Sequence, residues 1–242
     1  MNISIFIRSY AKDKEWLRLC LQALQKRLQS QEILPLEIVV AIPKGDAGVF
    51  ADFPFADLCA REIYVSQRHP NPYVDQQVTK ILADTYCLGD FILHVDSDSI
   101  AREPLDLSYY FVEGRPKLLF RKWEDAGTAI CWKLITTQVL RVVPFFETMP
   151  SIGIMYHRST HALFRQYLEQ VHGLSFGAWV GTVGNLSEFN AIGNFAHMFT
   201  PEAYHFIRAV GPGADCYPRP FRQFYSHDGV EKHQVELNQL LA

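Results

Sequence analysis

Two aspartates stand where an apolar segment of the chain ends. Asp96 and Asp98 follow Phe91 to Val95, which is apolar apart from one histidine. Two carboxylates at positions i and i+2 can both turn toward one ligand. Burying them side by side is costly unless a cation compensates their charge. A divalent ion bound to a diphosphate is such a cation, because its oxygen ligands bridge protein and phosphate. The pair therefore favours a metal-diphosphate site.

The elements before this pair predict the scaffold that positions it. Short apolar runs rich in β-branched residues indicate buried strands at Ile3–Ile7, Glu37–Ile42, Arg61–Val65 and Phe91–Val95. Helical spacing predicts one helix after Asp13, which can cap it, and another over Asp75–Cys87. This order is typical of an α/β fold whose mixed, mostly parallel, Rossmann-like sheet is flanked by helices. A ligand is expected beyond the carboxyl ends of the strands, near Arg8, Ser9, Tyr10 and the two aspartates.

The second half of the chain has a less regular pattern. Strands are expected at Lys117–Phe120 and Ala129–Leu134, and a helix capped by Ser159 should end at Gly173. A short helix is expected over Ser187–Phe195. The segment Gly211–Gly229 is rich in glycine, proline and aromatic residues, which indicates an ordered loop.

Composition excludes several classes of protein. The 242 residues carry a formal net charge of -3 and contain no basic run, so we expect no positive electrostatic potential that would bind nucleic acid. No signal peptide and no apolar run long enough to span a membrane is evident. The five scattered cysteines predict neither a disulfide framework nor a zinc site, which favours reduced thiols and a cytoplasmic location.

Five segments together resemble the GT-A glycosyltransferases, and most closely a poorly characterised bacterial group of them. The segments are Ile5-Phe-Ile-Arg-Ser-Tyr10, Gln76-Gln-Val-Thr-Lys80, Asp96-Ser-Asp98, Ser187-Glu-Phe-Asn190 and Ser226-His-Asp-Gly229. The resemblance implies a GT-A fold in one domain, residues 1–242, with a nucleotide-sugar donor half (1–105) and an acceptor half (106–242). It also implies a nucleotide-diphosphate sugar, by family habit a UDP-sugar, and sugar transfer to a hydroxyl group.

The resemblance assigns a metal site to the paired aspartates and a late histidine. Asp98 resembles the acid that binds the metal directly, and Asp96 the one that contacts the ribose or reaches the metal through water. His227 resembles the histidine of the C-terminal loop that returns to the same ion. A mixed carboxylate and imidazole site favours Mn²⁺ over Mg²⁺, which prefers oxygen ligands alone.

Other residues take roles in binding the donor. Tyr10 is expected to stack on the nucleotide base, and Arg8 needs an anionic partner, for which a phosphate is a candidate. Gln76 and Lys80 lie one helical turn apart and so share a face, which in the family looks toward the nucleotide. Trp123, in a polar loop, is the first choice for stacking on a sugar, ahead of Trp132, Trp179 and Tyr156.

Glu188 is the candidate general base. An inverting transfer needs a carboxylate that takes the proton of the attacking hydroxyl group. In a retaining enzyme Glu188 would instead orient the substrate. Asn190 is a candidate for contacts with sugar hydroxyls, and His157 and Arg158 for the acceptor pocket. His94 is expected to be a packed core residue.

Three alternatives remain open. Phosphatases of the haloacid-dehalogenase type also use an Asp-x-Asp motif, but theirs closes the first strand and is joined by a later acidic pair that this chain lacks. Sugar-nucleotide pyrophosphorylases have a glycine-rich loop after the first strand, where this chain has Arg8-Ser-Tyr-Ala-Lys12. A binding module without turnover would keep the donor site alone. The acceptor is equally open between a glycan, a lipid-linked sugar and another hydroxyl compound, and so is peripheral membrane association.

Overall fold

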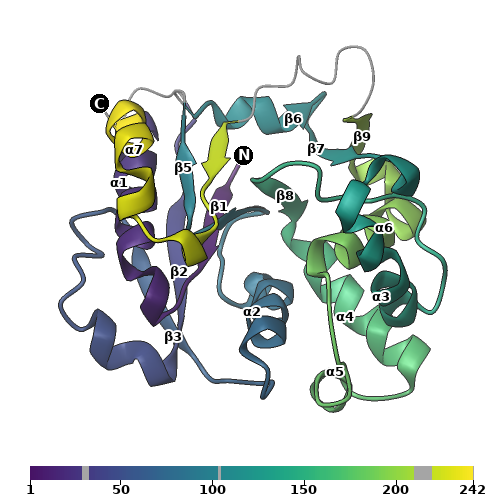
Figure 1. Cartoon of the computed structure of the whole chain (residues 1–242). Coiled ribbons are helices and arrows are strands. Elements are labelled where there is room, and N and C mark those ends of the chain that lie inside the picture. Colours follow the sequence, from purple (N-terminus) through teal and green to yellow (C-terminus); the bar gives the residue numbers. More distant parts are fainter. Residues whose placement is uncertain (29–32, 103–104, 210–219, 242) are drawn as a thin grey trace.

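The computed structural model describes residues 1–28, 33–102, 105–209 and 220–241. A central sheet lies between helices, with two small sheets beside it (Figure 1). The strands are β1 (Ile3–Arg8), β2 (Glu37–Pro43), β3 (Arg61–Val65), β4 (Phe91–Asp96), β5 (Ser99–Ala101), β6 (Phe111–Val112), β7 (Arg115–Phe120), β8 (Ile154–His157), β9 (His205–Arg208) and β10 (Phe221–Gln223). The α-helices are α1 (Lys14–Leu28), α2 (Pro72–Ile81), α3 (Cys131–Leu140), α4 (Arg158–His172), α5 (Phe176–Val180), α6 (Glu188–Phe199) and α7 (Gln234–Leu241).

The central sheet has the strand order β3-β2-β1-β4-β8. The first four strands run parallel, and β8 pairs with β4 in the antiparallel direction. All four strands predicted in the first half are confirmed. Because β1 and β4 are neighbours, Arg8 at the end of β1 lies beside Asp96 at the end of β4. The sheet thus brings two predicted site residues together although they are far apart in the sequence.

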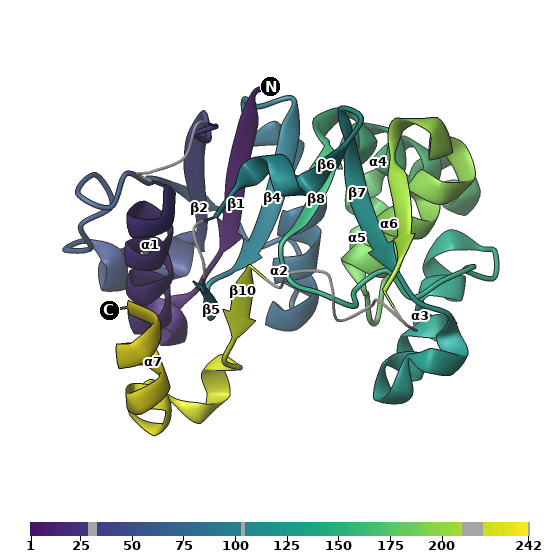
Figure 2. The ribbon, with the colours of Figure 1, turned by 90° about the horizontal axis from the view of Figure 1, so that it is seen from above.

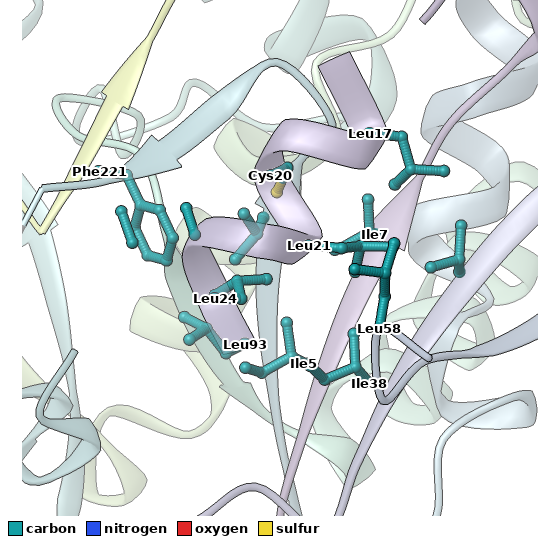
Figure 3. Close-up of a cluster of buried hydrophobic side chains, with 14 of the residues drawn as sticks. Ile5, Ile7, Leu17, Cys20, Leu21, Leu24, Ile38, Leu58, Leu93 and Phe221 are labelled. Atoms are coloured by element: carbon teal, nitrogen blue, oxygen red, sulfur yellow. The ribbon is translucent and has the colours of Figure 1, made fainter. Parts of the chain in front are cut away.

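The two faces of the sheet are buried by different elements. Alternate residues of each strand point to opposite faces. Ile5 and Ile7 of β1 pack with α1, whose Leu17, Leu21 and Leu24 belong to the same apolar cluster (Figure 3). Phe6 of β1 belongs to a separate cluster on the other face. Because both faces are covered, β1, β2 and β4 are apolar along most of their length.

The second half of the chain joins the same sheet through β8. Its helices α4 and α6 form a second apolar cluster with α2, in which Val74 and Val78 meet Phe164 and Ile192. Figure 2 shows α4, α5 and α6 gathered beyond β8, while α1 and α7 lie side by side at the other end. The two halves are therefore connected by a continuous sheet and by the packing of α2 against α6.

A late segment of the chain returns to the end of β4. Strand β10 pairs antiparallel with β5, the short strand after Asp98, so that Gln223 lies opposite Ser99. A separate three-stranded sheet has the order β6-β7-β9. The predicted strand Lys117–Phe120 is confirmed as part of β7.

Some predicted elements differ from the structure. The strand expected at Ala129–Leu134 is wrong, because Gly127–Ile130 is a 3-10 turn and α3 follows it. Thr136, Val139 and Leu140 are the buried residues of α3, and their spacing of three and four is helical. Helix α4 begins at Arg158, two residues earlier than a helix capped by Ser159 would, and has no side-chain cap, so the capping role of Ser159 is wrong. Gly173 does end it, with φ of 64°.

Helix α2 begins and ends earlier than the predicted Asp75–Cys87. The side chain of Asn71 accepts a hydrogen bond from the backbone N–H of Tyr73 and caps the helix before Pro72. After Ile81 the chain continues as a 3-10 turn, Ala83–Thr85. The earlier start leaves Asp75 in the first turn, where its carboxylate accepts the backbone N–H groups of Arg68 and His69.

The predictions on the cysteines, the Gly211–Gly229 loop and membrane-spanning helices concern the described residues as follows. Four cysteines are described and all are free, while Cys216 lies outside the described residues. Of the predicted loop Gly211–Gly229, residues 211–219 also lie outside them, and the rest forms β10 and a 3-10 turn, Ser226–Asp228. Within the described chain, helices of the length and apolar character needed to cross a membrane are absent.

Candidate active site

Asp96 and Asp98 lie at the carboxyl end of β4, as predicted. Asp96 is the last residue of the strand, and its side chain remains one-third exposed, whereas Asp98 is buried. Burial, followed by the charge of Asp96, raises the pKa of Asp98 to about 6. The two carboxylates thus concentrate negative charge that the protein compensates only in part.

The returning β10 segment covers this pair from one side. The side-chain Nε2 of Gln223 lies 3.3 Å from Asp96 Oδ2 and 3.3 Å from Asp98 Oδ1. The backbone N–H of Ser226 donates to Asp98 Oδ2 at 3.0 Å, and that of Phe224 to the Asp98 carbonyl at 3.0 Å. Gln223 therefore contacts both aspartates, a role that no sequence pattern indicated.

A buried lysine joins Asp96 to Glu188. Lys80 Nζ, from α2, lies 2.7 Å from Asp96 Oδ1 and 3.0 Å from Glu188 Oε1. The ammonium group also lies 4.8 Å from the ring centre of Phe189. Burial alone would lower the pKa of Lys80, but the two carboxylates outweigh it and raise the pKa above its usual value. Lys80 was predicted to face the nucleotide, and in the structure it forms ion pairs with these two acids.

Glu188 is the first residue of α6 and is buried. At a helix N-terminus the backbone dipole favours a negative charge, and Lys80 adds a full positive charge beside it. The side chain of the preceding Ser187 makes no cap to the helix; its Oγ accepts a hydrogen bond from Asn190 Nδ2 at 2.9 Å. Glu188 is thus held at the boundary between the two halves of the chain.

These residues line a central cavity of about 520 Å³. Seven of the predicted site residues are among its walls: Arg8, Tyr10, Gln76, Lys80, Asp96, Asp98 and Glu188. The opposite wall comes from the second half and includes Trp132 of α3 and Met149. Trp132 stacks on Tyr73 of α2, with ring centres 6.2 Å apart and planes at 23°. Both halves of the chain therefore contribute side chains to one concave site.

A side cavity of about 700 Å³ adjoins the central one at the ends of β1, β2 and β3. The two cavities share Arg8, Tyr10, Tyr73 and Gln76. Arg8 is buried and pairs with Asp75 at 3.5 Å. Burial lowers its pKa, and among the described residues its Nε finds no hydrogen-bond partner. A desolvated cation thus stands at the junction of the two cavities.

Two predicted binding residues lie away from these cavities. Trp123 is buried, and its indole N–H donates to the Pro144 carbonyl at 3.0 Å. Asn190 is fully buried, and its side chain accepts the backbone N–H of Thr148 at 2.8 Å. Neither is among the described residues that line the cavities. Both pack the second half together, and Trp132 is the tryptophan that faces the site.

The predicted three-residue metal site is not assembled in the described chain. His227 is exposed, and its ring centre lies 6.3 Å from the ring centre of Tyr225. No cluster of three or more His, Cys, Asp or Glu side chains suited to a metal ion occurs among the described residues. Asp96 and Asp98 nevertheless fit a divalent cation, because its charge would compensate two carboxylates whose burial and mutual repulsion raise the pKa of Asp98. The ligand chemistry fits as well, since carboxylate oxygens suit Mn²⁺ and Mg²⁺.

Sequence reasoning missed several residues of the site. Asp13, considered only as a helix cap, is buried and accepts a hydrogen bond from Ser97 Oγ at 2.9 Å. Burial raises its pKa. His94 is buried as expected but also lines the cavity, with its Nε2 3.2 Å from His161 Nε2. The position of Asp13 close after Tyr10, at the end of the first strand, is the feature of the sequence that could have placed it near the site.

Comparisons with known proteins support the fold. No family model matches the sequence, and no curated protein matches it. Among solved structures, the galactosyltransferase LgtC in complex with donor and acceptor sugar analogues superposes with a TM-score of 0.58 at 10% identity. The match covers 99% of this chain and 96% of that one. An active-site glutamine-to-glutamate mutant of LgtC gives a TM-score of 0.54 at 11% identity, covering 97% and 95%. The chain thus has the GT-A fold of LgtC.

Proposed function

We propose that the protein is a glycosyltransferase that moves a sugar from a nucleotide-diphosphate donor, a UDP-sugar in the first instance, to a hydroxyl acceptor. The observation that carries the proposal is the central cavity, where Asp96 and Asp98 of the first half face Glu188 of the second half. The GT-A fold that this chain shares with LgtC supports the same reading.

The two adjoining cavities suit the two parts of such a donor. The side cavity lies beyond the carboxyl ends of three parallel strands, where α/β sheets bind nucleotides. It would receive the nucleoside, with the ring of Tyr10 against the base. Arg8, which lines both cavities and whose Nε has no hydrogen-bond partner in the described part of the chain, would then meet the diphosphate. The sugar would enter the central cavity.

A divalent cation, Mn²⁺ or Mg²⁺, would be held by Asp96 and Asp98. When bound it would supply positive charge to the diphosphate leaving group. The protein's own part at this point is to hold the two carboxylates in place through the backbone N–H of Ser226 and through Lys80. The guanidinium of Arg8 would compensate part of the negative charge of the phosphates.

Glu188 would act as the general base. The acceptor oxygen forms a bond to the anomeric carbon while the bond from that carbon to the diphosphate oxygen breaks. The diphosphate leaves with the bonding electrons, and Glu188 takes the hydroxyl proton. Lys80 holds the carboxylate in place, with its Nζ 3.0 Å from Glu188 Oε1. One displacement of this kind inverts the anomeric centre.

The acceptor would enter along the wall formed by the second half. Trp132 presents an aromatic surface for a sugar ring, and the exposed Met149 also lines the cavity. A glycan, a lipid-linked sugar and another hydroxyl compound all satisfy this chemistry. The acceptor class is therefore to be found by screening.

The test compares wild type with Glu188→Gln and Asp98→Asn in a transfer assay with a panel of nucleotide sugars. Glu188→Gln should bind the donor with nearly unchanged Kd while kcat falls by roughly a hundredfold or more. Asp98→Asn should weaken donor binding in the presence of Mn²⁺. NMR of the first product formed should show inversion. Full transfer by Glu188→Gln, or retention at the anomeric centre, would rule out the base assignment, and donor binding without any turnover would indicate a binding module.

A further inference from the structure

Gln223 is the side chain that lies between the two aspartates. Its Nε2 is 3.3 Å from an oxygen of each carboxylate, and these oxygens, Asp96 Oδ2 and Asp98 Oδ1, are not the ones that contact Lys80 or Ser226. The position between two carboxylate oxygens is the one that a shared cation would take. The side chain is therefore placed at the site itself rather than on its rim.

The backbone fixes Gln223 in this position. Strand β10 pairs with β5, which begins immediately after Asp98, and Gln223 is opposite Ser99 in that pairing. Two further backbone bonds tie the following residues, Phe224 and Ser226, to Asp98. The two aspartates and Gln223 thus belong to one hydrogen-bonded unit, whereas His227 is exposed at its far end.

The amide of glutamine can face either a carboxylate or a cation. It carries a donor NH₂ group and an acceptor oxygen on the same carbon, and a half-turn of the group exchanges them. With Nε2 forward it bridges two carboxylates, as the structure shows. With Oε1 forward it would present a neutral oxygen, which is an accepted ligand of hard divalent ions.

We propose that Gln223 Oε1 is the third protein ligand of the divalent cation held by Asp96 and Asp98. This inference rests on the proposed metal-dependent donor site and deepens it. The protein's ligands would then all be oxygen atoms, in place of the carboxylate and imidazole set that the sequence predicted. An all-oxygen site accepts Mg²⁺ as well as Mn²⁺, because Mg²⁺ disfavours nitrogen ligands.

The test measures binding of Mn²⁺ by electron paramagnetic resonance, and of Mg²⁺ by competition, with and without UDP. Three variants separate the candidates: Gln223→Met keeps the shape but lacks the oxygen, Gln223→Glu keeps an oxygen, and His227→Ala removes the imidazole. We expect Gln223→Met to weaken Mn²⁺ binding by about tenfold or more. Gln223→Glu should bind at least as tightly as wild type, and His227→Ala should change neither the affinity nor the Mn²⁺ to Mg²⁺ ratio by more than about twofold.

The outcomes separate this inference from the proposed function. Wild-type affinity in Gln223→Met, with an unchanged melting temperature, would overturn the ligand role of Gln223 and leave the donor site standing. Loss of Mn²⁺ binding in His227→Ala alone would show that the imidazole of His227, and not Gln223, is the third ligand. UDP binding by wild type that needs no metal would overturn the inference on Gln223 and leave a nucleotide site. If wild type binds neither metal nor any nucleotide tested, both the inference and the proposed function are wrong.

Discussion

Lys80 Nζ lies 3.0 Å from Glu188 Oε1, joining a helix of the first half of the chain to the first residue of a helix in the second. The same ammonium group lies 2.7 Å from Asp96 Oδ1. One buried cation therefore compensates the predicted base and one of the paired aspartates. It also couples the geometry of the two halves across the cavity that they enclose.

Removing this cation should destabilise the protein. Lys80→Met leaves two acids without their counter-charge and should lower the free energy of unfolding by about 3 kcal/mol at pH 7. The pKa of Lys80 is raised in the folded state, so its stabilising effect is complete below its unfolded pKa and is lost only as the pH rises through the folded value. Urea unfolding at pH 7 provides the measurement.

The control for Lys80→Met is the double variant with Glu188→Gln. Because the second change removes one of the uncompensated acids, the double variant should be more stable than Lys80→Met alone. Equal stability of the two variants would show that Lys80 and Glu188 do not interact in solution.

Asp98→Asn should be more stable than wild type at neutral pH in the absence of metal. The pKa of Asp98 is raised from 3.8 to about 6 by burial and by Asp96, so folding favours the protonated form. The wild-type side chain therefore costs no stability below about pH 4 and its cost grows as the pH rises to about 6. The gain in Asp98→Asn should reach at most about 3 kcal/mol at pH 7 and be nearly lost at pH 4. Thermal unfolding across this range would check it, and a gain independent of pH would contradict it.

Gly193→Ala should separate α6 from the segment that it packs against. A Cβ atom at this position would lie 2.4 Å from Thr148 Oγ1 and 2.7 Å from Thr148 Cβ. The overlap should cost about 1–3 kcal/mol in unfolding free energy. Gly177→Ala in α5 is the matched control, because no atom of the described residues lies within 4 Å of the added Cβ. Similar melting temperatures for the two variants would mean that α6 is not packed as described.

Trp132 and Trp123 should respond to truncation in opposite ways. Trp132→Ala removes an aromatic surface from the cavity and should raise a substrate KM by about fivefold with a modest change in stability. Trp123→Ala removes a buried side chain and should cost about 3–5 kcal/mol of unfolding free energy. Steady-state kinetics and urea unfolding of both variants test the assignment. A raised KM in Trp123→Ala, after correction for folded fraction, would reverse it.

Most of the first half of the fold was predictable because β1, β2 and β4 are buried on both faces. Ile3–Ile7 and Phe91–Val95 therefore appear as apolar runs, and the parallel order places Arg8 beside Asp96. Glu188 and Asp98 could be found from their residue types near expected element ends. The strand predicted at Ala129–Leu134 was wrong because the buried residues of α3, Thr136, Val139 and Leu140, lie after that segment, and only the tertiary structure defines this helical stripe.

The rest of the site depends on packing between distant segments. Gln223 reaches the aspartates only because β10 pairs with β5, more than a hundred residues earlier in the chain. The ion pair between Lys80 and Glu188 depends on how α2 packs against α6. The helical spacing of α2 indicates the side of the helix on which Lys80 lies but not the residue that it contacts. Trp123 and Trp132 are equally aromatic in sequence, and only the fold decides which one meets the cavity.

The most direct test of the central claim is calorimetric titration of UDP and GDP into the protein, with and without Mn²⁺, for wild type and Asp98→Ala. We expect one of the two nucleotides to bind wild type in a Mn²⁺-dependent way, and this binding to be lost in Asp98→Ala. Binding that is equally strong in Asp98→Ala, or absent from wild type for both nucleotides under all conditions, would contradict a metal-dependent donor site at the end of β4.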